Sequence, residues 1–393
     1  MLTLKFLLWT SAITIFYSYL GYGCILWAYL KIIKAFKKPQ DSKPRTFFEP
    51  EISLVIAAYN EEDIIEEKIK NCLQLDYPAE KLQIIFVADG STDSTTEIIS
   101  RYSRVKLLYK PERKGKVAAI NRAMSFVTTP FVVFCDANTI LNEACIKEIV
   151  NHYSDEKIGA VAGEKKIISH TNSSDAASAG EGLYWKYESI LKKLDAEFYT
   201  VVGAAGELFS VRTHLFDPVP EGILLDDFMI SMKICIKGYR VMYEPKAFAS
   251  ETSSFSMKEE QKRKIRISAG GFQSVLQLKK LLNIFKYGKL SFQYISHRVL
   301  RWIVCPVMLP LLFTSSLFLY YYTNEFWYLL LLCLQLLFYM AATAGFIFAS
   351  KNIKIKALYI PYYFVFMNAA LYLGFVKFLN NQQSVLWEKA KRK

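Results

Sequence analysis

Three long runs of apolar residues set the first limit on how this chain can fold. Residues 6–30 and 357–376 carry no charged side chain, and residues 303–350 carry only Glu325. A run of about 20 apolar residues is long enough to cross a bilayer as a helix. The polar stretch YYYTNEF, residues 320–326, divides the longest run in two. The sequence therefore predicts about four membrane spans.

The first run has the position of a signal peptide but not its form. It is longer than the apolar core of a signal peptide, and it is followed by the basic stretch KIIKAFKK instead of a small-residue cleavage site. We expect residues 1–30 to be a retained transmembrane anchor.

Positive charge is concentrated beside the apolar runs. The formal net charge is +13, with lysines clustered in residues 31–38 and a further basic region from Lys262 to Arg301. This placement indicates contact with anionic lipid and phosphate and not a nucleic-acid groove. By the positive-inside rule, residues 31–301 face the cytosol, which predicts a multi-pass cell-membrane protein with a cytoplasmic catalytic domain.

Two further features bear on topology and redox chemistry. The seven cysteines form no CxxC pair, so neither a disulfide framework nor a zinc site is indicated.

The predicted number of spans would place the basic tail WEKAKRK outside the cytosol, which contradicts the positive-inside rule. Either the last apolar segment, around Pro361, is re-entrant or interfacial, or the tail departs from the rule.

The region from Glu51 onward alternates apolar strands with amphipathic helical patterns. Continuous apolar runs of this length are typical of parallel strands covered on both faces, and the alternation predicts a βαβ arrangement. The predicted strands are residues 52–58, 83–88, 105–109 and 131–135.

Polar residues follow three of these strands at the point where each strand ends. They are Tyr59 to Glu61, Asp89 to Ser91 and Asp136 to Asn138. Each group alone is also a common turn, but ligands of open α/β sheets bind at the carboxyl ends of the strands. Their recurrence at corresponding positions predicts a site there.

The polar residues have the chemistry to bind a sugar diphosphate. Asp136 and Asn138 offer oxygen ligands to a divalent cation such as Mg²⁺ or Mn²⁺, with much of the coordination left to phosphate and water. Lys116 opens a predicted helix, where its ammonium and free backbone N–H groups would meet a phosphate. A solvated surface lysine is the alternative.

Asp226 and Asp227 precede a predicted helix. One carboxylate would cap that helix, which leaves the other free to accept the proton of an attacking hydroxyl. Attack opposite the leaving diphosphate inverts the anomeric centre. A purely structural role for Asp227 is the alternative.

The ordered motifs IAAYNEE, FVADGSTD, KGK, FCDAN, LLDDF and KGYRVMYEP resemble the inverting glycosyltransferase family two. Together with the flanking spans, they resemble the branch of hyaluronan, chitin-oligosaccharide and poly-N-acetylglucosamine synthases. The resemblance implies a GT-A type α/β fold. It also implies a site in which Tyr59, Glu61 and Asp89 bind a uracil-type donor, Lys116 its diphosphate, Asp136 with Asn138 ribose and metal, and Asp227, with Asp226 beside it, serves as general base.

Two stretches depart from the family pattern or lie beside it. Processive relatives carry QxxRW, whereas this chain has RKIRI at residues 263–267, without the aromatic ring. Arg263 and Arg266 share a helical face and would clasp the diphosphate or contact lipid headgroups. The loop GAAGELF, residues 203–209, resembles the family's small-residue loop beneath the acceptor sugar, although the resemblance does not explain Glu207. The aromatic rings near Trp185 would stack sugars or pack on an interfacial helix.

The sequence thus predicts a membrane-embedded enzyme that transfers sugar from a UDP-linked donor to a growing poly- or oligosaccharide. A non-processive transferase with a lipid acceptor and a non-catalytic, nucleotide-sugar-binding synthase subunit are the alternatives, and partner subunits for export are compatible with so few spans. The expected parts are an anchor (1–30), a basic linker (31–50), a GT-A domain (51–255), basic interfacial helices (256–302), three membrane segments (303–379) and a basic tail (380–393).

Overall fold

The computed structural model describes residues 1–36, 48–168, 176–252, 257–351, 353 and 355–381. The chain divides into two compact units. The first consists of residues 1–35, 169–187 and 254–383, and the second of residues 36–168, 188–253 and 384–393. Much of the expected linker and tail, residues 37–47 and 382–393, lies outside the described residues.

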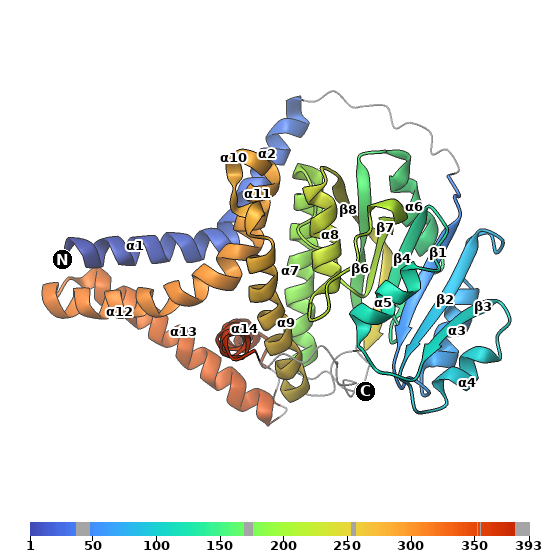
Figure 1. Ribbon diagram of the computed structural model, residues 1–393. Helices are drawn as coiled ribbons and strands as arrows, with labels where there is room; N and C mark the ends of the chain where they lie inside the picture. Colours follow the sequence, from blue (N-terminus) through green and yellow to red (C-terminus); the bar gives the residue numbers. More distant parts are fainter. Residues whose placement is uncertain (37–47, 169–175, 253–256, 352, 354, 382–393) are drawn as a thin grey trace. The chain divides into compact units, whose positions relative to one another are not determined.

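The second unit is built on one mixed sheet of eight strands (Figure 1), in the order β3-β2-β1-β4-β7-β6-β8-β5. Neighbours in the first half of this order are parallel, whereas β7 is antiparallel to both β4 and β6. The strands are β1 (Ile52–Ala58), β2 (Leu82–Asp89), β3 (Val105–Lys110), β4 (Phe131–Asp136), β5 (Ile140–Leu141), β6 (Ile158–Ile168), β7 (Leu208–Arg212) and β8 (Arg240–Thr252).

Helices cover both faces of this sheet. The helices of the unit are α3 (Ile65–Leu73), α4 (Thr95–Ser100), α5 (Lys116–Met124), α6 (Cys145–Val150), α8 (Asp226–Ile236) and the later part of α7 (Ala176–Phe198), with short 3₁₀ turns η2 (Asn151–Ser154) and η3 (Thr213–Leu215). Every residue of β1 is buried, as expected for a strand with cover on both faces. Its alternate residues Ile52, Leu54 and Ile56 share a core with α3 and α6.

The four strands predicted from apolar runs are present as β1 to β4. Parallel register sets Ala58 beside Ala88 and Ala57 beside Asp136, so the ends of β2, β1 and β4 lie at one edge of the sheet. The polar groups that follow these strands therefore converge at this edge, as the sequence predicted.

The first unit is helical. Its elements are α1 (Leu2–Phe16), η1 (Tyr17–Gly21), α2 (Tyr22–Phe36), the beginning of α7, α9 (Met257–Gln277), η4 (Lys279–Leu282), α10 (Ile284–Tyr287), α11 (Lys289–Tyr294), η5 (Ile295–Val304), α12 (Cys305–Thr323), α13 (Phe326–Ser350) and α14 (Lys356–Leu379).

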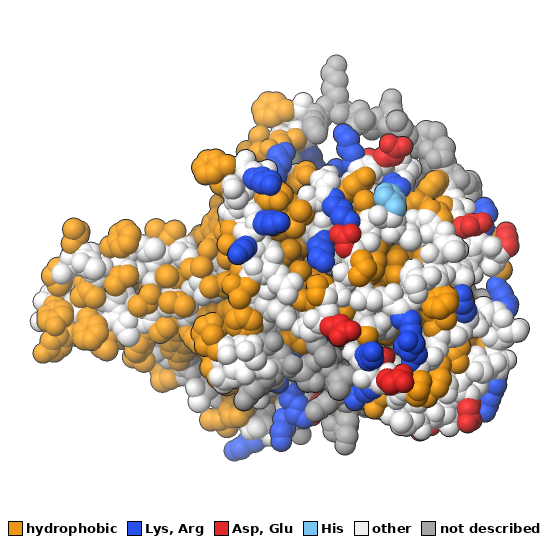
Figure 2. Space-filling view, in the orientation of Figure 1, with side chains coloured by type: hydrophobic (Ala, Val, Ile, Leu, Met, Phe, Trp, Pro, Cys, Tyr) orange, Lys and Arg blue, Asp and Glu red, His pale blue; other side chains and the backbone are white. Residues whose placement is uncertain are grey.

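Four helical stretches of the described chain are long and apolar enough to cross a membrane. They are residues 2–36, 289–323, 326–350 and 357–379, in agreement with the number of spans predicted from the apolar runs. Leu8 of α1 packs with Leu319 and Tyr328 of the α12–α13 hairpin. On the face seen in Figure 2, the outer parts of these helices carry orange apolar side chains, as expected for contact with lipid.

Two helical boundaries differ from the predicted ones. The first helix runs past the apolar stretch to Phe36, because residues 31–36 include lysines and alanine, which favour helix. The second candidate span begins at Lys289, so the end of the expected interfacial region is continuous with that helix.

This second candidate span contains a buried cation, Arg301. Arg301, 7% exposed, donates from Nε to the carbonyl of Ser18 at 3.0 Å and from Nη2 to the hydroxyl of Tyr187 at 2.6 Å. Tyr187 in turn donates to the carbonyl of Tyr19. Both carbonyls belong to the π-helical segment η1, and Arg301 lies in a second π-helical segment, η5. Irregular backbone inside a span is tolerated where side chains satisfy its carbonyls.

One glycine position lets the loop before β7 pack against α8. Gly203 has φ +87°, and a Cβ there would lie 2.1 Å from the ring of Phe228. Gly222 has a similar φ of +91°, but nothing lies within 4 Å of its Cβ position. The two positions share backbone strain and differ in packing.

We therefore predict that Gly203→Ala lowers the melting temperature more than Gly222→Ala. Both pay the strain of a left-handed alanine, about 1–3 kcal/mol, and only Gly203→Ala adds an overpacking cost of about 1–3 kcal/mol. Thermal unfolding of the detergent-solubilised chain measures the difference. Equal shifts would show that Phe228 moves aside freely.

Candidate functional site

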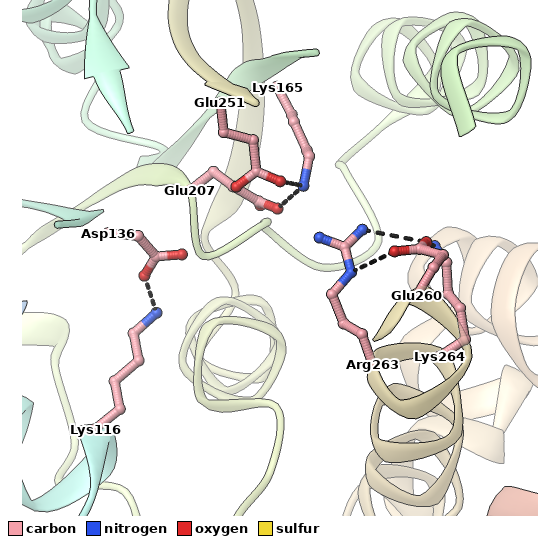
Figure 3. Close-up of polar contacts among 8 residues, drawn as sticks. All are labelled: Lys116, Asp136, Lys165, Glu207, Glu251, Glu260, Arg263 and Lys264. Carbon is pink, nitrogen blue, oxygen red and sulfur yellow. Dashed lines mark hydrogen bonds and ion pairs between the residues drawn. The ribbon is translucent and has the colours of Figure 1, made fainter. Parts of the chain in front are cut away.

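The centre of the polar edge is an ion pair between Lys116 and Asp136. Asp136 is the last residue of β4, and Lys116 is the first residue of α5, after Gly115 at φ +92°. Lys116 Nζ lies 2.5 Å from Asp136 Oδ1 (Figure 3), with the two side chains 20% and 32% exposed. The pair thus remains accessible to a ligand.

Asp226 and Asp227 lie in the first turn of α8. The residue that caps this helix is Leu225, and no side chain caps it, so the prediction that one of these carboxylates forms the cap is wrong. Asp227 Oδ1 instead accepts the N–H of Phe228 at 2.8 Å, within the helix. Asp226 is 7% exposed, and its Oδ2 is buried without a hydrogen bond among the described residues.

Burial and the neighbouring carboxylate of Asp226 raise the pKa of Asp227 to about 7. Lys116 opposes this rise, and Glu207 adds to it. For Lys116, burial disfavours the charged form, but Asp136, Asp226 and Asp227 outweigh this and raise its pKa. A carboxyl group with a pKa near neutrality can accept and release a proton at physiological pH.

Gly206 lies between these charges. A Cβ at this position would be 3.1 Å from Lys116 Nζ and 3.3 Å from Asp227 Oδ2. The small-residue loop that precedes β7 therefore passes directly beside both groups.

Asp89, at the end of β2, fastens the loop that leads to Lys116. Its Oδ2 accepts the backbone N–H groups of Lys114 at 3.0 Å and Gly115 at 2.6 Å. Its Oδ1 is buried and has no hydrogen-bond partner among the described residues. One buried carboxylate oxygen is thus available to an N–H donor from a ligand.

The loop after β1 is tied to the loop after β2. The guanidinium of Arg113 lies 3.7 Å from the ring centroid of Tyr59, a cation–π contact. The N–H of Thr92 donates to Asn60 Oδ1 at 2.9 Å, and the N–H of Glu61 donates to Thr95 Oγ1 at 2.8 Å. Tyr59, Asp89, Lys116, Asp136 and Asp227 therefore belong to one unit, as do Glu61, Asn138 and Asp226.

Asp136 and Asn138 fit a divalent ion only as a partial ligand set. Asp136 shares one oxygen with Lys116, and within the described residues no group of three or more His, Cys, Asp or Glu side chains could hold a metal. Any metal there would take its remaining ligands from a bound diphosphate and water.

A second ionic cluster in the same unit was not predicted. Lys165 of β6 is fully buried and pairs with Glu207, at 2.6 Å, and with Glu251 of β8 (Figure 3). Sequence spacing gives no signal for it, because the three residues come from separate strands and a loop.

Arg263 and Arg266 lie on α9 in the first unit. Arg263 Nε is 3.2 Å from Glu260 Oε2, one turn earlier on the same helix, and Lys264 Nζ is 3.4 Å from Glu260 Oε1 (Figure 3). Arg263 is therefore held by its own helix, and the predicted clasp around a diphosphate stays a prediction.

The aromatic residues around Trp185 pack against another helix, which was the alternative to stacking on a sugar. Lys264 Nζ of α9 lies 4.9 Å from the ring of Tyr184 and 5.8 Å from that of Trp185. Together with the hydrogen bonds of Tyr187, these contacts explain the rings by packing inside the first unit.

Comparison with known families decides the class of this domain. Residues 53–216 match the family model described as glycosyl transferase family 2. Residues 53–216 are thus a family 2 glycosyltransferase domain. The resemblance predicted from the motifs is thus confirmed, and the match runs from β1 past Asp89, Lys116, Asp136 and Glu207 but ends before Asp226 and Asp227.

Similar proteins agree with this domain assignment. The chain is 29% identical to a poly-beta-1,6-N-acetyl-D-glucosamine synthase of Staphylococcus aureus over 238 residues, 58% of this chain and 56% of the relative. A synthase of the same name from Staphylococcus epidermidis is 24% identical over 237 residues, with the same coverage. The chain therefore spans a little over half the length of these curated relatives.

The chain also has a fold similar to that of a solved mannosyltransferase from Pyrobaculum calidifontis in complex with GDP-Man and Mn²⁺. The TM-score is 0.67 at 21% identity, over 95% of this chain and 99% of that one. The predicted GT-A type α/β fold is confirmed.

Proposed function

We propose that this chain is a membrane-embedded inverting glycosyltransferase that transfers a sugar from a UDP-linked donor to a growing poly- or oligosaccharide, with Asp227 as general base. One observation carries the proposal: Asp227 is a carboxyl group with a pKa near 7 beside a lysine that also pairs with Asp136 at the strand edge. A base and an anion-binding cation are thus a few ångströms apart. The family 2 domain and the synthase relatives support the reaction class.

Asp89 and Tyr59 are the proposed base-binding residues. The buried Oδ1 of Asp89 suits the imide N–H of uracil, which cytosine and adenine lack at that edge. Guanine carries a comparable N–H, and the structural neighbour was solved with GDP-Man, so a guanosine-linked donor is the competing outcome of a donor panel. Tyr59, under Arg113, offers a ring on which the base stacks.

The diphosphate is assigned to Lys116 and the start of α5. The ammonium and the first N–H groups of a nine-residue helix both attract anionic oxygen. Asp136 and Asn138 would hold Mg²⁺ or Mn²⁺, which neutralises charge on the departing diphosphate. Glu61, buried in the loop after Tyr59, supports the donor side of the site.

Asp227 completes the chemistry. It removes the proton of the acceptor hydroxyl while that oxygen forms a bond to the anomeric carbon and the bond to the diphosphate breaks. The proton stays on Asp227 and the electron pair leaves with the nucleotide. Attack from the face opposite the leaving group inverts the anomeric centre. Asp226, by its negative charge, keeps the pKa of Asp227 high.

The four candidate spans and the flanking basic residues support a multi-pass membrane protein with this site on the cytoplasmic side. Partner subunits would then complete an export path for a long product. Residues 263–267 of α9 lack the aromatic residue of the processive motif. This absence favours a second candidate, a non-processive transferase that acts on a lipid acceptor. Arg263 and Arg266 would then lie near the lipid headgroup or the diphosphate. Extraction of the product into organic solvent separates the two.

We predict that Asp227→Asn lowers the transfer rate by about 10²–10⁴-fold while nucleotide binding is retained, because only the proton acceptor is lost. Nucleotide release with a UDP-sugar panel measures turnover, and calorimetry measures UDP affinity. Asp217→Asn is the control, since Asp217 is a half-exposed carboxylate paired with Lys237. Unchanged turnover in Asp227→Asn would instead support a non-catalytic, nucleotide-sugar-binding subunit.

Asp136→Ala should weaken donor binding and the response to Mn²⁺ together, since the same carboxylate serves both. We expect the donor KM to rise about tenfold. Titration of Mn²⁺ against initial rate at fixed donor provides the measurement. A normal metal response in the variant would assign the metal elsewhere.

The pH dependence follows from the raised pKa of Asp227. The base works only when deprotonated, so kcat/KM should increase from about pH 6 to about pH 8 and then level off. Removing the neighbouring negative charge in Asp226→Asn should lower the pKa of Asp227 and move this limb to lower pH. A limb that stays in place in Asp226→Asn would contradict the assignment.

A further inference from the structure

The segment that leads into α8 is stiff and has few backbone hydrogen-bond donors. It follows η3 and has the sequence FDPVPEGILL, residues 216–225. Proline has no backbone N–H, so Val219 supplies the one backbone donor of residues 218–220. Each of the two residues that precede a proline here is restricted to extended conformations. A contact that fixes this segment therefore bears on where the next residues, Asp226 and Asp227, are placed.

Asn121 of α5 binds both backbone polar groups of Val219. Its Nδ2 donates to the carbonyl of Val219 at 2.8 Å, and its Oδ1 accepts the N–H of Val219 at 3.0 Å. Val219 is 2% exposed, and a buried backbone group that loses its partner is costly. One side chain thus forms a clamp of two hydrogen bonds, here called the Asn121 clamp, between α5 and the segment before α8.

The helix that provides this clamp also carries Lys116. Lys116 is the first residue of α5, and Asn121 follows about 7.5 Å further along the helix axis. A Cβ at Gly206 would lie 3.1 Å from Lys116 Nζ and 3.3 Å from Asp227 Oδ2, so the ammonium and this carboxylate flank the same position. Helix α5 therefore lies near the start of α8 at Lys116 and holds the preceding segment at Asn121.

Lys237 ties the same segment to α8 itself. At the end of α8, Lys237 Nζ donates to the carbonyl of Leu215 at 2.9 Å and lies 2.8 Å from Asp217 Oδ1. These bonds join the beginning of the segment to the end of its own helix and do not fix either of them relative to α5. The Asn121 clamp provides that second connection, and it is left in place by Asp217→Asn, the control for Asp227.

We propose that Asn121 is a positioning residue for Asp227: by clamping Val219, it holds the start of α8 in register with Lys116 and hence with the diphosphate of the donor. This inference rests on the proposed function of the site. A displacement of about 1 Å between reacting groups can lower a rate about 10²-fold. Loss of the clamp removes no group that is assigned to the donor, so it acts on the rate of transfer and not on the affinity for the nucleotide.

The test compares Asn121→Ala with the unchanged full chain in detergent. The donors are UDP-N-acetylglucosamine, UDP-glucose and GDP-mannose with Mn²⁺, the acceptor is an N-acetylglucosamine oligomer, and nucleotide release measures turnover. For the donor with the highest turnover, we expect kcat to fall about 10–100-fold, while donor KM and nucleotide affinity change less than about twofold. An unchanged kcat, or a higher donor KM with kcat retained, would overturn the inference.

Asn142 offers a matched control, because it forms the same kind of clamp elsewhere in the unit. Its Nδ2 donates to the carbonyl of Lys246 at 3.0 Å, and its Oδ1 accepts the N–H of Phe248 at 2.7 Å, both in β8. We expect Asn142→Ala to lower the melting temperature about as much as Asn121→Ala and to change kcat less than about twofold. If it lowers kcat as much as Asn121→Ala does, the loss comes from stability and the inference fails.

A double-mutant cycle with Asp227→Asn separates positioning of the base from any independent effect. If Asn121 acts through Asp227, adding Asn121→Ala to Asp227→Asn should change the residual transfer rate less than about twofold. If the two losses multiply, Asn121 does not act through the base, and only this inference is overturned. If Asp227→Asn alone keeps full turnover, or if the unchanged chain uses none of the donors, the proposed function itself fails.

Asn121→Asp is the second variant, for the case that Asn121→Ala does not fold. It has the same shape and keeps an acceptor for the N–H of Val219, but it loses the N–H that binds the carbonyl of Val219. We expect a lower kcat with nucleotide affinity retained. Full kcat in Asn121→Asp would count against the clamp as a positioning device.

Discussion

The ammonium of Lys116 is the interaction on which the polar edge of this sheet depends. It lies 2.5 Å from Asp136 and within electrostatic range of Asp226 and Asp227, carboxylates that would otherwise repel one another in a largely buried place. Lys116 also begins α5, so the start of that helix is held to the end of β4. Gly206 leaves room for this arrangement, because any side chain there would press on both Lys116 and Asp227.

The sheet changes direction at the point where this site forms. Strands β2, β1 and β4 end together and supply Asp89 and Asp136, whereas β7 is antiparallel to β4 and begins where β4 ends. The turn into β7 therefore brings Glu207 to the same edge from the opposite chain direction.

The sequence predicts the part of this architecture that is local. Strands β1 to β4 are recognisable because each is a continuous apolar run, and the candidate spans because each contains an apolar run long enough to cross a bilayer. Lys165, Glu207 and Glu251 could not be assembled in the same way, since the pairing of β6 with β7 and β8 joins segments far apart in the chain. The prediction that an aspartate caps α8 was wrong, because residue type alone does not show whether Asp226 stands before the helix or in its first turn.

The helical unit has a polar interior that anchoring alone does not require. Arg301 lies buried in a helix that is long and apolar enough to cross a membrane, and burying a guanidinium in such a helix is costly unless oxygens replace its water. The carbonyl of Ser18 and the hydroxyl of Tyr187 do this, and a π-helical segment supplies the carbonyl. Because Tyr187 belongs to α7, the same network holds the first part of that helix inside the helical unit. A leucine at position 301 would remove the hydrogen bonds that Arg301 donates to Ser18 and Tyr187 and would leave only the one that Tyr187 donates to Tyr19.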